Sequence, residues 1–85
     1  MKLYLHEECA VRKEDIVGIF DMDSATVSPE SRRFLSEKEK EGGITLATED
    51  IPVSFVVTKE KENLRVYLTR NAPRALCRRA ERFGL

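Results

Sequence analysis

The sequence predicts a small α+β fold in which a mostly antiparallel sheet carries one central helix and one C-terminal helix. Residues 53–58 and 64–69 are two β-rich runs around a short polar segment, which is typical of a hairpin. The pair Ser28–Pro29 starts one helix and Pro73 starts another. A chain of 85 residues has room for one hydrophobic core, so residues 1–85 are expected to form a single domain.

The N-terminal part predicts three strands. Residues 3–5 form a short strand and residues 10–12 are its return. Residues 15–21 are an apolar run with β-branched residues, bounded by acids, and this pattern predicts a buried strand. Gly18 within this run indicates the close approach of another backbone or of a large side chain.

The central helix is expected from Ser28, its N-cap, to about residue 41, where the pair Gly42–Gly43 ends it. Its apolar content is thin, with only Phe34 and Leu35, so one narrow edge of the helix should pack against the sheet. Residues 44–46 predict a further short strand.

The C-terminal hairpin has the clearest pattern in the chain, with residues 59–63 as its polar loop. Alternation along its second strand places Leu64, Val66 and Leu68 on one face and Arg65, Tyr67 and Thr69 on the other. The Arg65 and Tyr67 face could stack on nucleic-acid bases, although a helix more often covers such a tyrosine. In the final helix, which Gly84 ends, the helical period predicts a buried stripe of Leu76, Ala80 and Phe83.

Charge divides the chain into two unlike parts. Residues 1–64 hold nine basic and fourteen acidic side chains, whereas residues 65–85 hold six arginines and a single acid, Glu81. Arginine presents a planar fork of donors that suits phosphate and carboxylate. The candidate nucleic-acid-binding residues are Arg70, Arg74, Arg78, Arg79 and Arg82. Alternatively, these arginines dock on the acidic part of the same fold or of a neighbouring subunit.

One motif resembles an enzyme site. Asp21 and Asp23 follow the apolar strand, as in haloacid-dehalogenase-type phosphatases, where one carboxylate attacks phosphorus with the help of Mg²⁺. That fold needs several parallel strands with helical crossovers, and too few residues follow the motif here. The favoured interpretation is that the two aspartates make turn contacts with the backbone, and the phosphatase is a remote alternative.

Other chemistry is not expected. A metal site at residues 6–9 is disfavoured because four adjacent residues in an extended segment cannot easily converge on one ion, so His6 is expected at the surface. The cysteines Cys9 and Cys77 are expected to be free thiols of a cytoplasmic protein, since the N-terminus lacks a signal peptide. We expect no catalytic residue, cofactor, metal, small-molecule substrate or membrane contact.

Three segments stand out by their order and spacing: residues 15–21, residues 55–58, and residues 66–69 followed by the helix that bears residues 76–80. In these segments the chain resembles the RemA/RemB family of bacterial extracellular-matrix regulators, and the RemB branch in particular. The resemblance covers about residues 3–83. It implies a non-enzymatic α+β domain that forms a homo-oligomer and, in the RemA branch, binds double-stranded DNA and activates biofilm-matrix genes.

The chain departs from this family in one loop. RemA-like proteins carry a DNA-contacting arginine pair before the strand that matches residues 55–58, whereas here residues 48–53 are acidic and contain no arginine. Any DNA surface must therefore come from the C-terminal arginines or from Arg32 and Arg33. The expected function is a matrix-gene regulator that acts as an oligomer, and the alternative is an interaction module that does not bind DNA.

Overall fold

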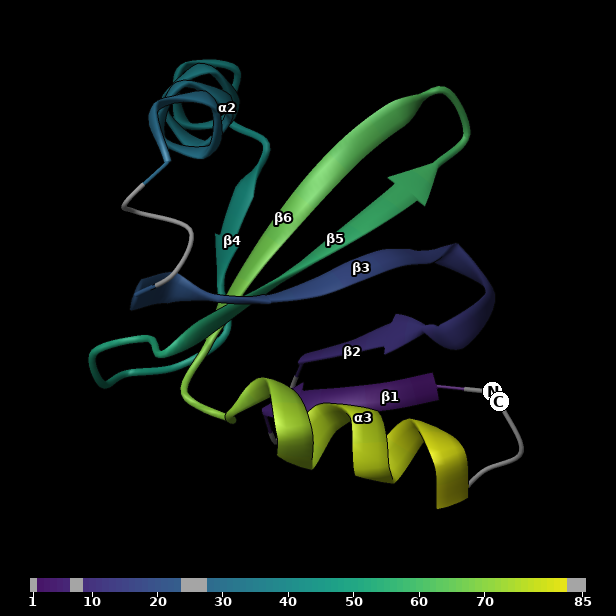
Figure 1. Cartoon of the computed structure of the whole chain (residues 1–85). Coiled ribbons are helices and arrows are strands. Elements are labelled where there is room, and N and C mark those ends of the chain that lie inside the picture. Colours follow the sequence, from purple (N-terminus) through teal and green to yellow (C-terminus); the bar gives the residue numbers. More distant parts are fainter. Residues whose placement is uncertain (1, 7–8, 24–27, 83–85) are drawn as a thin grey trace.

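Figure 1 shows the computed structural model of the chain, which describes residues 2–6, 9–23 and 28–82, with the backbone alone at His6 and residues 79–82. The strands and helices, in chain order, are β1 (Lys2–His6), β2 (Cys9–Arg12), the 3₁₀ turn η1 (Lys13–Asp15), β3 (Ile16–Asp21), α2 (Pro29–Lys40), β4 (Ile44–Leu46), β5 (Ser54–Glu60), β6 (Asn63–Thr69) and α3 (Pro73–Arg82). The α+β class and the mostly antiparallel pairing predicted from the sequence are confirmed.

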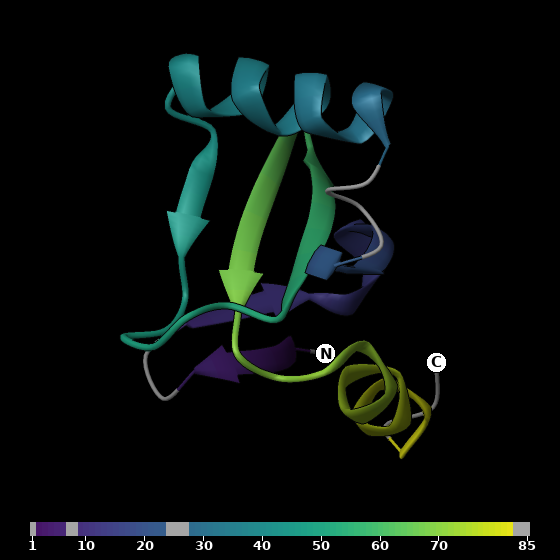
Figure 2. The same cartoon turned by 60° about the vertical axis from the view of Figure 1, so that its left-hand side comes forward.

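The elements form three layers, and the middle layer is a four-stranded sheet. The strand order is β3-β5-β6-β4, with β5 antiparallel to both neighbours and β4 parallel to β6. Figure 2 shows α2 across one side of the sheet, with the separate β1–β2 hairpin and α3 on the opposite side. Helix α2 is the crossover connection that brings β4 back parallel to β3, as such pairs of strands require.

Strand β5 is buried on both faces. Phe55 and Val57 pack with Val66 in the layer beneath α2, whereas Val56 packs on the opposite face with the β1–β2 hairpin and with Leu76 of α3. The alternation predicted for β6 is also confirmed, since Leu64, Val66 and Leu68 belong to the α2 layer and Tyr67 to the other. The two faces of one hairpin therefore anchor both outer layers.

Helix α2 has the ends that the sequence predicts. The Ser28 hydroxyl accepts a hydrogen bond from the Ser31 amide (3.4 Å), and Pro29 occupies the first turn. Gly42 has a φ of +75°, the left-handed conformation that ends a helix. Phe34 and Leu35 are only half-buried, and no residue of α2 is fully buried, so the narrow packing edge is confirmed.

A polar cluster ties the start of α3 to the sheet and to β1. The Asn71 side-chain amide donates to the Leu5 carbonyl (2.8 Å) and to the Thr69 hydroxyl (3.1 Å), and Thr69 itself donates to Leu5 (3.2 Å). The Ser54 hydroxyl donates to the Asn71 carbonyl. Because Ser54 and Thr69 are fully buried, this network fixes the chain just before α3 begins.

Two predictions about strands are wrong. The run at residues 15–21 is not a buried strand, because β3 lies at the edge of the sheet, where Val17 is 61% exposed and Phe20 45% exposed. Helix α2 carries too few apolar side chains to cover this edge. The hairpin loop is also shorter than residues 59–63, since pairing continues to Glu60 and Asn63, and Lys61 adopts a φ of 61° in the turn.

Gly18 has the close neighbour that the sequence indicates, and that neighbour is the ring of Phe20. A Cβ atom at position 18 would lie 2.6 Å from the Cζ atom of Phe20, so any larger residue there would displace this ring from its present position. The ring stacks on Phe55 with centroids 5.1 Å apart. The predicted burial of Ala80 and Phe83 and the helix end at Gly84 fall outside the residues and side chains that are described.

Leu76 is 0% exposed, and among the described side chains of α3 it is the one that belongs to the core of the hairpin layer. We therefore expect Leu76→Ala to lower the free energy of unfolding by about 2–5 kcal/mol, measured by urea denaturation. Arg74→Ala, at an exposed position of the same helix, is the matched control and should change stability by no more than about 0.5 kcal/mol. Equal losses for both variants would contradict this docking of α3.

Candidate nucleic-acid interface

Helix α3 is held with one side against the hairpin layer, which determines where its arginines lie. It contacts β3 and β1, and Leu76 is the buried anchor of that contact. A helix turns by about 100° per residue, so Arg74 and Arg78, each two residues from Leu76, lie on its opposite side. Both arginines are exposed, as their positions on the helix require.

Arg74 and Arg78 have no acidic partner within the part of the chain that the structure describes. Ion pairs among the described side chains include Arg12 with Glu14, Lys38 with Glu41, and Arg70 with Asp50. The interpretation in which the final helix docks its arginines on the acidic part of its own fold is therefore not realised at these two positions. The side chains of Arg79 and Arg82 lie outside the described atoms.

Arg70 lies just before α3 and extends the same basic region. Its side chain is 62% exposed, and its Nε atom is 3.9 Å from Oδ2 of Asp50, a long contact between exposed groups that contributes little. We define the arginine surface as Arg70, Arg74 and Arg78. Three exposed cations, of which only Arg70 has an acidic neighbour among the described residues, are an arrangement that suits a polyanion.

Arg65 and Tyr67 do not belong to this surface. The Arg65 side chain is half-buried and its Nε atom donates to the Thr45 hydroxyl (3.0 Å). Tyr67 packs partly into the hairpin layer, and its hydroxyl donates to Glu60 (3.0 Å). Burial, with a smaller contribution from Glu60, raises the pKa of Tyr67, so the phenol stays protonated at neutral pH. A base-stacking role for this face is not supported.

The acidic loop at residues 48–53 lies beside Arg70. Its Thr48 hydroxyl accepts a hydrogen bond from the Asp50 amide (3.1 Å), which forms a local turn, and Ile51 at its tip is 81% exposed. Asp50 is therefore held close to one cation of the arginine surface and reduces the local positive potential.

The two aspartates that resemble a phosphatase motif lie at the exposed end of β3. Oδ1 of Asp21 accepts a hydrogen bond from the Asp23 amide (2.8 Å), so the predicted turn contact is confirmed for Asp21. Among the described residues, no group of three or more His, Cys, Asp or Glu side chains is placed to hold a metal ion. The His6 side chain is outside the described atoms.

Both cysteines are free thiols, as predicted. Cys77 is exposed on α3, whereas Cys9 is half-buried beside the hairpin core, and this burial raises the pKa of its thiol. In the described part of the chain, no helix has the length and hydrophobicity that crossing a membrane requires.

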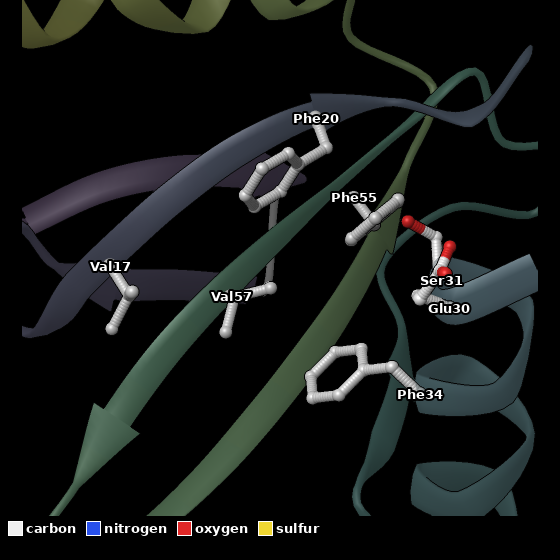
Figure 3. A pocket seen from close by; sticks show the side chains of 7 residues that line it. All are labelled: Val17, Phe20, Glu30, Ser31, Phe34, Phe55 and Val57. Atoms are coloured by element: carbon white, nitrogen blue, oxygen red, sulfur yellow. The ribbon is translucent and has the colours of Figure 1, made fainter. Parts of the chain in front are cut away.

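Sequence reasoning missed an apolar groove between β3 and α2. Figure 3 shows the Phe20 and Phe34 rings at this groove, one from each element, with Phe55 and Val57 of β5 as its floor. The groove has a volume of about 280 Å³, and Val17 and the polar residues Glu30 and Ser31 complete its lining. The exposure of Val17 and Phe20 depends on the edge position of β3, which the local sequence does not reveal.

Comparison with known proteins does not assign the chain to a family. No family model matches it, and no curated protein matches it significantly.

The Asp21 contact generates a stability prediction. Asp21→Asn should lower the free energy of unfolding by at most about 1–2 kcal/mol, because the new side chain keeps an oxygen that can accept the Asp23 amide. Chemical denaturation measures this loss, and a Mg²⁺-dependent assay with an aryl phosphate is run on both proteins in parallel. Phosphatase turnover that disappears in Asp21→Asn would contradict the turn interpretation and favour the remote enzymatic alternative.

Proposed function

We propose that this protein is a cytoplasmic, non-enzymatic regulator of bacterial extracellular-matrix genes that forms a homo-oligomer and contacts double-stranded DNA through the arginine surface. The observation that carries the proposal is the exposure of Arg74 and Arg78 on the side of α3 opposite Leu76, with no acidic partner among the described residues.

Electrostatics supports a phosphate partner. A guanidinium group that has no intramolecular carboxylate keeps its donors available, and its planar fork binds phosphate oxygens in a bidentate manner. Phosphate contacts position a protein on a duplex but carry no sequence information. The proposed binding is therefore largely independent of sequence, and several subunits contribute to it together.

The resemblance to the RemA/RemB family supports the regulatory part of the proposal. The acidic loop at residues 48–53 stands where RemA-like proteins have their arginine pair, so the proposed DNA contacts lie on α3 and not on that loop. The apolar groove beside β3 supports the second candidate, an interaction module without DNA binding, because an exposed apolar surface favours a protein partner.

A salt titration tests the DNA contact. We expect the double variant Arg74→Ala/Arg78→Ala to weaken binding to any duplex and to reduce the slope of log K against log salt by about 2 per subunit engaged, through lost counterion release. Fluorescence anisotropy with two labelled duplexes of unrelated sequence measures both quantities.

The matched control is Arg32→Ala/Arg33→Ala, which removes the same charge from exposed positions of α2. It should leave the salt slope unchanged. If the control loses affinity and the α3 variant does not, the DNA surface lies on α2. If wild-type protein binds neither duplex at low salt, the interaction module without DNA binding is the better account.

A further inference from the structure

Strand β3 is an edge strand with little of the usual protection against pairing. Natural edge strands are commonly short or interrupted by charges, proline or bulges. Residues 16–20 contain no charge and no proline, and the only irregularity in the pairing of β3 lies near its start, between Ile16 and Gly18. The opposite edge, β4, has only three residues. Strand β3 is therefore the longer edge strand, and with Val17 and Phe20 it exposes more large apolar side chains than β4 does.

The hydrogen bonds between β6 and the β4 segment, at the other edge of the sheet, indicate in which direction the N–H and C=O groups of β3 point. The Val66 amide donates to the Gly43 carbonyl (2.9 Å), and the Leu68 carbonyl accepts from the Ala47 amide (2.7 Å). Val66 and Leu68 therefore direct their backbone groups toward β4. Because the direction alternates along a strand, Tyr67 between them bonds β5.

The same alternation of hydrogen-bonding direction holds along β5, and it determines which residues of β3 bond to β5. Tyr67 lies opposite Val56, so Val56 bonds β6 and Phe55 bonds its partner Phe20 in β3. The Met22 amide, which donates to the Val53 carbonyl (3.0 Å), follows the same pattern. Ile19, between Phe20 and Gly18, consequently points its N–H and C=O groups away from the sheet, as does Asp21.

We infer that β3 pairs antiparallel with β3 of a second copy about a two-fold axis through Ile19, which joins two sheets into one. This inference rests on the homo-oligomer of the proposed function and names its interface. In this register the two Ile19 residues exchange their outward-pointing N–H and C=O groups. The same surface patch serves on both copies, as an isologous interface requires.

The side chains of β3 favour a second copy as the occupant. With Ile19 on the axis, Gly18 of each copy lies opposite Phe20 of the other. Each Phe20 ring already lies over its own Gly18, so the two rings lie side by side across the axis on the α2 side of the sheet. Asp21, the only charge in β3, lies opposite Val17 of the second copy, so the two carboxylates do not face each other.

The symmetry of this interface also determines where the two arginine surfaces of the dimer lie. A two-fold axis perpendicular to a continuous sheet keeps the same faces of both copies on the same side. The two α2 helices and the two apolar grooves then share one side, and the two α3 helices share the other. Since α3 contacts β3, both arginine surfaces flank the axis and can engage one duplex together.

The test places a charge on the proposed interface. Val17→Glu changes an exposed side chain of β3, and Leu46→Glu, at a residue that is 62% exposed on β4, is the matched control. Light scattering at micromolar concentration should give wild-type protein an even multiple of 9.8 kDa. Val17→Glu should lower this mass at least twofold, and Leu46→Glu should leave it unchanged.

Amide hydrogen exchange provides a readout that does not depend on the variant folding well. In wild-type protein the Ile19 amide should be protected at high concentration and should lose at least tenfold in protection on dilution to monomer. The Phe20 amide, bonded to β5, should stay protected throughout. An Ile19 amide that exchanges equally fast at both concentrations would overturn the inferred pairing.

The remaining outcomes separate this inference from the proposed function. An oligomer that survives Val17→Glu, or that Leu46→Glu alone disrupts, overturns the β3 pairing and leaves both the homo-oligomer and the DNA contact standing. A monomeric wild-type protein overturns both the pairing and the proposed homo-oligomer. The DNA titration tests the contact between the arginine surface and DNA independently of that result.

Discussion

The burial of β5 on both faces is the constraint on which the rest of the fold depends. Phe55 and Val57 attach α2 to one face, and Val56 attaches the β1–β2 hairpin and α3 to the other. This strand lies in the middle of the sheet beside β6, so β3 and β4 are left at the edges. The exposed apolar side chains of β3 and the groove beside it are consequences of this central strand.

The polar cluster around Asn71 fixes the start of α3 relative to that sheet. The Asn71 amide and the Thr69 hydroxyl both reach the Leu5 carbonyl, so the hairpin layer and the end of β6 are joined at the point where α3 begins. Leu76 then buries one side of the helix, and Arg74 and Arg78 face away from it. Within the part of the chain that the structure describes, the direction of the arginine surface thus depends on the Asn71 hydrogen bonds and on the burial of Leu76.

Local patterns in the sequence predict the parts of the fold that local chemistry determines. The N-cap Ser28, the helix end at Gly42 and the alternating faces of β6 are properties of short segments, and all three are confirmed. The edge position of β3 and the Asn71 cluster depend on neighbours far along the chain, which periodicity cannot supply. The exposure of Arg74 and Arg78 follows from the helical period once Leu76 is known to be buried.

We propose above all that α3, and not α2, presents the surface through which this domain contacts DNA. Chemical-shift mapping of the backbone amides during titration with a short duplex tests it directly, because each helix reports its own contacts. We expect the largest shift changes at Arg70 and along α3 near Arg74 and Arg78, with those near Arg32 and Arg33 unchanged. Shift changes confined to α2, or none at low salt, would contradict the claim.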